Sequence, residues 1–214
     1  MAIKPILFNT EMVRAILDGR KTCTRRVAKN VPDHIHRIEH VYENGRFQFD
    51  CFYSSYVVAL DAYADFCMPC LPPYQQGDIL YVRETWSHPI VPSDKNRYVY
   101  RADEVAEDGF KNEAHIWHPS IHMPKEAARI WLKVTDVRVE RLQDITEDGA
   151  KAEGANWKNG KNVGWEEKMR HTAIERFAEI WESTVKKSDL NRYGWNANPW
   201  VWVIEFERCE KPKE

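Results

Sequence analysis

A lysine and a threonine three residues apart, Lys21 and Thr24, are the side chains of this 214-residue chain best suited to chemistry. Lys21 has three neighbouring cations, and repulsion between like charges favours the neutral form of its amine, which is nucleophilic and basic. Those neighbours are Arg20, Arg25 and Arg26. Such an amine can activate the Thr24 hydroxyl by taking its proton. The spacing puts both side chains on one face of a helical turn but on opposite faces of a regular strand, so a shared pocket requires a turn or bulge.

The segment from residue 19 to residue 30 contains five cationic residues and no acidic one. The whole chain, by contrast, has 31 Lys and Arg against 33 Asp and Glu, a net charge of -2. This balance gives no general attraction to nucleic acid or to an anionic membrane, so any affinity for anions must be local. The segment is either a solvated basic loop or part of a functional site.

The elements around this segment follow from local patterns. Residues 3–8 are a short apolar run that predicts a strand, and Asn9 or Thr10 can cap a helix that continues to Leu17. Gly19 predicts the end of that helix, so the cations follow a helix C-terminus, where the helix dipole favours positive charge.

Downstream, strands dominate the predicted framework. We expect strands at 79–86, 98–101, 130–139 and 200–206, and helices at 146–153 and 166–185. Residues 31–78 are irregular and have few periodic apolar positions, which is typical of an insertion. Strands separated by turns, without alternation of strand and helix, favour a small mixed or antiparallel barrel with peripheral helices, an α+β fold that is mostly β.

Four separated blocks of the chain resemble, in the same order, those of the ASCH family of PUA-like β-barrels. The blocks are LDGRKTCTRR at 17–26, GDILYVRE at 77–84, LQDIT at 142–146 and WVWVIEF at 200–206. The resemblance implies one PUA-like domain over residues 1–214, with peripheral helices and a long irregular insertion. Residues 31–74 and 87–124 are then additions to the minimal domain.

The family includes bacterial N4-acetylcytidine amidohydrolases, whose site is a Lys and a Thr three apart after a Gly, plus a Glu on a later helix. Lys21 and Thr24 match the first two, and Glu153 matches the third, with Glu147 and Asp148 as rivals if the register differs. The broader family has an acidic residue where this chain has Thr24. The resemblance therefore implies hydrolysis of an N4-acyl group on a modified pyrimidine nucleoside, without a metal or another cofactor.

The expected partner is a modified nucleoside or RNA. The residues expected to bind it are Arg20, Arg26, Arg83, Glu84 and Trp86. Aromatic side chains can stack on a pyrimidine, although most of the nine Trp belong in the core. Two other functions stay open: a PUA-like module that binds RNA through the cations of residues 20–29 without turnover, and a ribonuclease.

Five cysteines, an odd number, do not suit a disulfide framework, so we expect reduced thiols. Cys67 and Cys70 have C-x-x-C spacing, and Cys51 with one of three histidines could complete a zinc site. Those histidines are His34, His36 and His40. Because no second C-x-x-C or suitably spaced histidine pair is present, buried thiols are the preferred interpretation, and we predict no metal.

Apolar runs in the sequence, such as residues 200–204, are much shorter than the ~20 residues that a membrane helix needs. The first ten residues contain only a brief apolar stretch, which is too short for a secretory signal. We therefore expect a cytoplasmic protein that does not bind membranes.

Overall fold

The computed structural model describes residues 1–29, 37–43, 46–52, 72–89, 98–104, 116–155 and 172–212. The chain forms two compact units, and each is described by itself. Unit 1 comprises Met1–Thr22, Gln76–Thr135 and Phe206–Glu214, and unit 2 comprises Cys23–Gln75 and Asp136–Glu205. Much of the two predicted insertions, 31–74 and 87–124, lies outside the described residues, so the single domain with two insertions stays a prediction.

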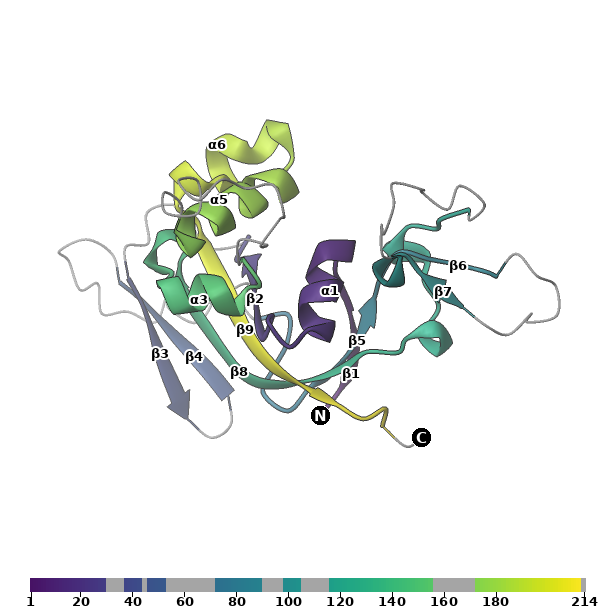
Figure 1. Cartoon of the computed structure of the whole chain (residues 1–214). Coiled ribbons are helices and arrows are strands. Elements are labelled where there is room, and N and C mark those ends of the chain that lie inside the picture. The colour runs from purple at the N-terminus through teal and green to yellow at the C-terminus, as the bar shows by residue number, and fades with distance from the viewer. Residues whose placement is uncertain are drawn as a thin grey trace. The chain divides into compact units, whose positions relative to one another are not determined.

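Strands form the framework, as expected for a mostly β member of the α+β class (Figure 1). Five strands make one sheet in the order β1 (Ile3–Leu7), β5 (Ile79–Arg83), β8 (Trp131–Arg141), β9 (Trp200–Cys209) and β2 (Cys23–Val27). β1 runs parallel to β5, whereas β5 with β8 and β2 with β9 are antiparallel. Within the described residues this sheet is open, with β1 and β2 as its end strands, and no closed barrel is present.

Two smaller pairs of strands complete the β structure. β3 (Arg37–Glu43) pairs with β4 (Arg46–Phe52), and β6 (Trp86–Ser87) pairs with β7 (Val99–Tyr100), both antiparallel. The predicted continuous strand at 79–86 is wrong, because β5 ends at Arg83 and β6 begins at Trp86. Between them the backbone N–H of Glu84 donates to the thioether sulfur of Met123 at 3.2 Å, which takes this residue out of the ladder.

In unit 1, helix α1 (Thr10–Leu17) begins as predicted, with the Asn9 side chain accepting from the Met12 N–H. It ends at Gly19, whose φ of 73° is left-handed, a conformation that glycine adopts without strain. The described part of unit 1 also contains three short 3-10 helices, of which η2 (Arg101–Asp103) follows β7 directly. The predicted strand at 98–101 is therefore shorter than expected.

The other 3-10 helices of unit 1 are η3 (Ser120–His122) and η4 (Lys125–Ala127). They lie in the chain that leads into β8, and their neighbours Met123 and Ala127 are buried. Together with Ile79, Trp86 and Trp131, these residues form the apolar cluster around β5 and β6.

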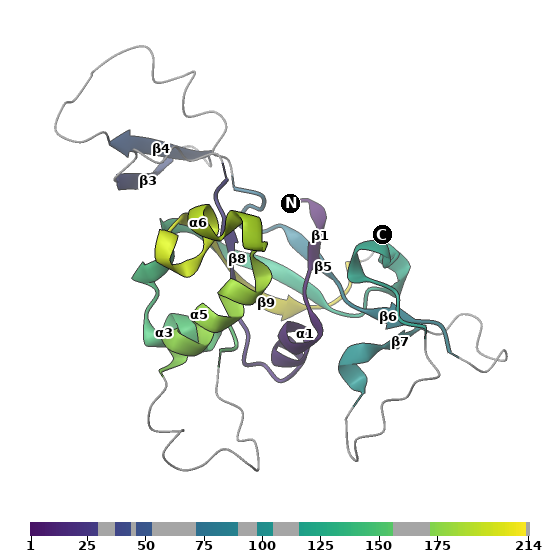
Figure 2. The same cartoon turned by 90° about the horizontal axis from the view of Figure 1, so that it is seen from above.

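In unit 2, α3 (Glu147–Ala152) and α5 (Ala173–Thr184) pack side by side, as Figures 1 and 2 show. The Thr146 hydroxyl caps α3, as predicted, and Thr172 forms a capping box with Glu175 at the start of α5. The predicted helix at 166–185 is confirmed from residue 173 to residue 184, and residues 166–171 lie outside the described residues.

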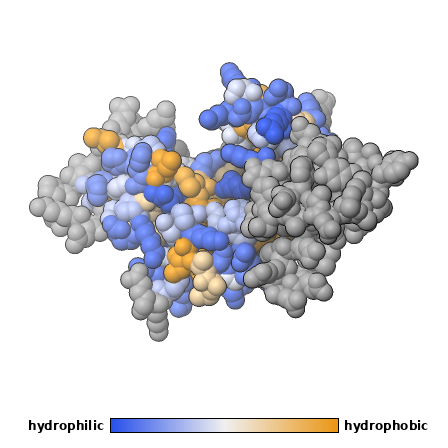
Figure 3. Space-filling view, turned by 180° about the vertical axis from the view of Figure 1, so that it is seen from behind, coloured by the Kyte–Doolittle hydropathy of each residue, from blue (hydrophilic) through white to orange (hydrophobic). Residues whose placement is uncertain are grey.

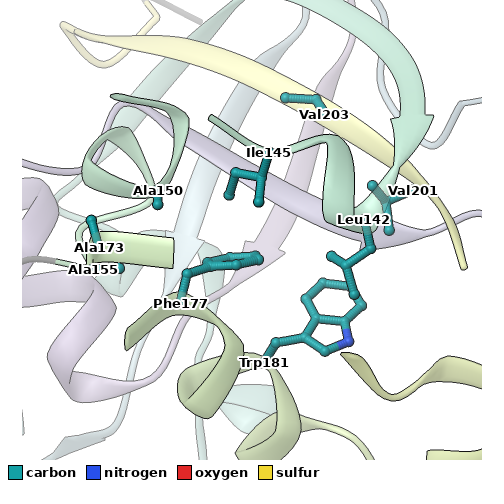
Figure 4. Packing of buried hydrophobic residues seen from close by; sticks show 9 residues of the cluster. All are labelled: Leu142, Ile145, Ala150, Ala155, Ala173, Phe177, Trp181, Val201 and Val203. Carbon is teal, nitrogen blue, oxygen red and sulfur yellow. The ribbon is translucent and has the colours of Figure 1, made fainter. Parts of the chain in front are cut away.

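The remaining short helices of unit 2 are η5 (Leu142–Asp144), η6 (Lys187–Asp189), α6 (Leu190–Tyr193) and η7 (Trp195–Ala197). The core of this unit lies between α3, α5 and the strands (Figure 4). Phe177 and Trp181 of α5 point into it, Phe177 toward Ile145 and Trp181 toward Leu142 (Figure 4). The predicted apolar stripe on α5 is therefore its buried face.

None of the helices that the structure describes has both the length and the apolar composition needed to cross a membrane. Most of the coloured residues visible in Figure 3 are hydrophilic, and the hydrophobic ones among them form small groups.

Candidate active site

Polar side chains buried in the described part of the chain include all three predicted catalytic residues. The buried polar and charged residues are Lys21, Thr24, Arg25, Asp78, Glu84, Ser87 and Glu153. Burying such groups is unfavourable unless they are paired or serve a function. The interpretation as a solvated basic loop does not hold for Lys21 and Arg25, which are removed from water, whereas Lys29 is exposed.

Lys21 is positioned in unit 1 by the end of α1. The backbone N–H groups of Gly19 and Arg20 donate to the carbonyls of Ile16 and Ala15, which is the double hydrogen bond of a Schellman motif. The Lys21 N–H also donates to the Ala15 carbonyl, at 2.9 Å. The helix end therefore fixes the backbone from which the Lys21 side chain starts.

The Lys21 side chain is only 2% exposed, and its Nζ lies 5.5 Å from the centre of the Phe8 ring. Phe8 in turn contacts Phe206, with ring centroids 6.2 Å apart. The amine therefore lies over the Phe8 ring, whose quadrupole attracts a cation.

Thr24 belongs to β2 in unit 2 and lies opposite Ile204 of β9. Its side chain is 1% exposed. Because side chains alternate along a strand, Thr24 and Arg26 lie on one face of β2, and Cys23 and Arg25 lie on the other. The hydroxyl is therefore held on a regular, buried strand.

Glu153 is the C-cap of α3 in unit 2, and its residual exposure is 8%. The helix ends in a second Schellman motif: Gly154 has φ 84°, and the N–H groups of Gly154 and Ala155 donate to Lys151 and Ala150. Glycine is needed at residue 154 because other residues are strained at this φ. The sequence Glu-Gly at 153–154 therefore both stops the helix and fixes the backbone of Glu153.

Two consecutive arginines of β2 are electrostatically coupled to the Glu153 carboxylate. Arg25 Nη1 lies 3.4 Å from Glu153 Oε1. Burial lowers the pKa of the half-buried Arg26, and the negative charge of Glu153 and the Tyr74 hydroxyl oppose that effect. β2 is an end strand of the sheet. A carboxylate beside such a strand can interact with side chains from both faces of the strand.

Tyr74 is the second ionisable neighbour of Arg26. Burial raises the pKa of the Tyr74 hydroxyl, and the Arg26 guanidinium opposes this shift. Arg26, predicted to bind substrate, thus lies in a partly buried polar group together with Tyr74 and Glu153.

The two rivals of Glu153 have other roles in α3. Glu147 Oε2 accepts a hydrogen bond from the Ala173 N–H at 3.0 Å, which joins α3 to α5. Asp148 is 91% exposed and pairs with Lys151. Of these three carboxylates, that of Glu153 is the most buried, and its catalytic role stays a prediction.

Arg20 and Arg83, predicted to bind substrate, are engaged by groups of unit 1 itself. Arg20 pairs with Asp18 at 2.7 Å. Arg83 donates to the carbonyls of Met123 at 2.9 Å and Ile121 at 2.5 Å, so it holds the chain around η3. Arg83 therefore has a structural role. Neither the residue type nor the position of Arg83 in the GDILYVRE block predicts this role.

Glu84 is 1% exposed and accepts both arms of Arg129, at 2.9 and 3.0 Å. Burial raises the pKa of the Glu84 carboxyl and outweighs the opposing effect of Arg129. The pKa of Arg129 also rises, because its hydrogen bonds to Glu84 and Asp103 outweigh its partial burial. Both pKa values rise, but for different reasons: burial dominates at Glu84, which is almost fully buried, whereas the hydrogen bonds dominate at Arg129, whose side chain is 28% exposed.

Trp86 is 7% exposed and lies within an aromatic cluster formed with His88, Tyr98 and His118. Its ring centroid is 4.9 Å from that of His118 and 5.1 Å from that of His88. The indole Nε1 is buried without a hydrogen-bond partner. Stacking of Trp86 on a substrate base stays a prediction.

The predicted site residues fall into both units. Thr24, Arg26 and Glu153 belong to unit 2, whereas Lys21 belongs to unit 1, as do Arg20, Arg83, Glu84 and Trp86. The covalent chain limits the separation of Lys21 and Thr24, because three residues span at most about 11 Å between Cα atoms.

Most residues of the alternative zinc site lie outside the residues that the structure describes. Cys67, Cys70, His34 and His36 lie outside the described residues, and for β3 and β4, which carry His40 and Cys51, only the backbone is described. In the described ranges no group of three or more His, Cys, Asp or Glu side chains could hold a metal ion. Cys23 and Cys209 are free thiols.

Comparisons of this chain with protein-family models, with curated proteins and with solved structures found no match.

Proposed function

We propose that this protein is an ASCH-type hydrolase with a PUA-like fold that removes the N4-acyl group of a modified cytidine. The observation that supports the proposal is the burial of an amine, a hydroxyl and a carboxyl, those of Lys21, Thr24 and Glu153, each below 9% exposed. The family resemblance assigns the reaction to the same three residues. Few other polar side chains in the described part of the chain are buried to this degree.

The chemistry requires a nucleophile, a donor for the oxyanion and a proton for the leaving amine. In the proposed reaction the Lys21 amine takes a proton from the Thr24 hydroxyl or from a water that this hydroxyl holds. The activated oxygen adds to the acyl carbon, and the bond from that carbon to N4 breaks. Glu153 relays the proton taken up by Lys21 to the departing N4 amine, which leaves as cytidine. When water is the nucleophile the free acid forms directly, and when Thr24 is the nucleophile a water then hydrolyses the acyl-threonine ester to the free acid.

Arg26 is the candidate donor to the oxyanion. It lies on the same face of β2 as Thr24, two residues away, and it is electrostatically coupled to Glu153. A guanidinium in a partly buried site stabilises developing negative charge more strongly than it would in water. This role gives the predicted substrate-binding residue Arg26 a specific target, the carbonyl oxygen of the acyl group.

RNA binding without turnover is the second candidate function. The burial and pairing of cations in residues 19–30 argue against it. Lys21 and Arg25 are buried, and Arg20 pairs with Asp18. A phosphate-binding surface needs cations that are accessible and that release counterions on binding. If RNA binding were the function, affinity for a short RNA would fall steeply with salt, and N4-acetylcytidine would not be hydrolysed.

The test is the release of acetate from N4-acetylcytidine by the purified protein and three variants. We expect Lys21→Met, Thr24→Val and Glu153→Gln each to lower turnover by at least about 100-fold, the usual contribution of a general acid or base. Each has a matched control at an exposed residue: Lys29→Met, Thr22→Val and Asp148→Asn.

The controls are expected to keep wild-type turnover. Normal turnover in Lys21→Met or in Glu153→Gln would remove that residue from the mechanism. Cleavage of RNA instead of acetate release would favour the ribonuclease alternative.

A further inference from the structure

We propose that Arg25 is a positioning residue for Glu153, and that Glu140 holds Arg25 in place. In the sequence, Arg25 is only one member of a basic cluster, and no pattern connects it to Glu140 or to Glu153. The kinetic part of this inference rests on the proposed function, because that is the reaction in which Glu153 would act. The contacts among Arg25, Glu140 and Glu153 do not depend on the proposed function.

The guanidinium of Arg25 contacts the two carboxylates in different ways. Its Nη2 and Nε donate to Oε1 of Glu140, at 2.5 and 3.1 Å. Its Nη1 approaches Oε1 of Glu153 at 3.4 Å. Arg25 is therefore held tightly by Glu140 and more loosely by Glu153.

The surroundings leave Arg25 little freedom. Its side chain is 2% exposed and its guanidinium lies 5.7 Å from the centre of the Phe177 ring. Cys23 Sγ is 3.9 Å from Nη1. On the α3 side, a Cβ on Gly149 would lie 3.4 Å from Nη2, so the glycine leaves room for the guanidinium.

Glu140 is itself fixed by a second arginine. Its Oε2 lies 3.5 Å from Arg138 Nε, while its Oε1 binds Arg25. Arg138 also pairs with Glu205 of β9 and with Asp136. The charges therefore alternate from Arg138 through Glu140 and Arg25 to Glu153, and this order connects the strand β8 to the end of α3.

This arrangement suits a carboxylate that has to exchange a proton. A carboxylate bound by both arms of a guanidinium has its oxygens occupied by strong charge-assisted hydrogen bonds. Because Glu140 takes two N–H groups of Arg25, the contact that Arg25 makes to Glu153 is longer, and it orients the carboxylate and compensates its charge. This contact constrains Glu153 less than a bond through both arms of the guanidinium would.

The first test is kinetic and separates positioning from substrate binding. With N4-acetylcytidine as the probe, we expect Arg25→Met to lower kcat by about tenfold or more while KM changes less than about twofold. Arg25→Lys keeps the charge and should recover part of the loss, whereas Glu140→Gln should give a smaller loss than Arg25→Met. The matched control is Arg176→Met, at an exposed ion pair of α5.

The second test does not depend on activity. Urea unfolding of wild type, Arg25→Met, Glu153→Gln and the double variant forms a double-mutant cycle. We expect Arg25→Met to change the unfolding equilibrium constant about tenfold less in the Glu153→Gln background than in wild type, since the interaction is then already lost.

The two tests distinguish the two proposals. Additive effects in the cycle, or an Arg25→Met enzyme with unchanged kcat, would overturn the positioning role. Absence of acetate release by the wild type, together with clear coupling in the cycle, would refute the proposed function and keep the contact between Arg25 and Glu153.

Discussion

Replacing Gly149 by alanine should destabilise the protein, although the same change stabilises most helices. Gly149 lies inside α3, where alanine is favoured over glycine by about 1 kcal/mol. A Cβ at this residue would lie 3.3 Å from Ile145 Cγ1, 3.3 Å from Thr146 Oγ1 and 3.4 Å from Arg25 Nη2. The first two distances are tighter than ordinary contacts and the third is at the lower limit of ordinary contact, so Ile145 and Thr146 would have to move.

Each of the three neighbours is held in place. Ile145 is buried in the core, Thr146 Oγ1 accepts the N–H of residue 149 itself at 3.0 Å, and Arg25 is bound to Glu140. Overpacking of this kind costs about 1–3 kcal/mol. Subtracting the helix gain leaves a net loss of about 1 kcal/mol in the free energy of unfolding.

Urea unfolding followed by far-ultraviolet circular dichroism measures this loss as a lower midpoint with an unchanged slope. The exposed Lys151→Ala on the same helix is the control and should keep a midpoint close to that of wild type. A Gly149→Ala protein that is more stable than wild type by about 1 kcal/mol would show that Ile145 and Thr146 move away from the added methyl group at little cost.

Two further predictions concern the elements that support the two units. Because burial raises the pKa of the Glu84 carboxyl, the folded state keeps that proton to higher pH than the unfolded state, and stability falls as pH rises from the ordinary glutamate pKa through the folded one. The free energy of unfolding of wild type minus that of Glu84→Gln should therefore decrease as pH rises from 4 to 7; an increase would contradict the raised pKa. Thr172→Ala removes the capping box of α5, in which Thr172 and Glu175 exchange hydrogen bonds of 3.1 and 2.8 Å, and should cost about 1 kcal/mol, while Ser183→Ala near the exposed end of that helix should change little. Equal stability of the Thr172→Ala and Ser183→Ala proteins would argue against the cap.

The helices were predictable because their signals are local. Asn9 and Thr146 cap α1 and α3 as the sequence predicted, and Gly19 ends α1. Caps, glycine stops and a 3.6-residue apolar period act within a few residues, so one sequence is enough to read them.

The interruption of the strand after Arg83 could not be predicted from a local pattern. The backbone of Glu84 binds Met123, 39 residues later, and its carboxylate binds Arg129, 45 residues later. Within the sequence, residues 79–86 keep the composition of one continuous strand, and only these distant partners separate β5 from β6.

The same limit applies to the candidate site. The types and spacing of Lys21 and Thr24 marked them as candidates, and the resemblance added Glu153. The role of Arg25 depends on Glu140 and Glu153, which are 115 and 128 residues away. No pattern around Arg25 distinguishes a buried, doubly paired guanidinium from a solvated one.

The most direct test of the account is the rate at which purified wild-type protein and the Lys21→Met variant convert N4-acetylcytidine to cytidine, measured by liquid chromatography. We expect the wild type to produce cytidine and acetate in equal amounts and Lys21→Met to be at least about 100-fold slower while still folded. Equal rates for the two proteins, or no cytidine from either, would contradict the proposal that the buried amine, hydroxyl and carboxyl carry out this hydrolysis.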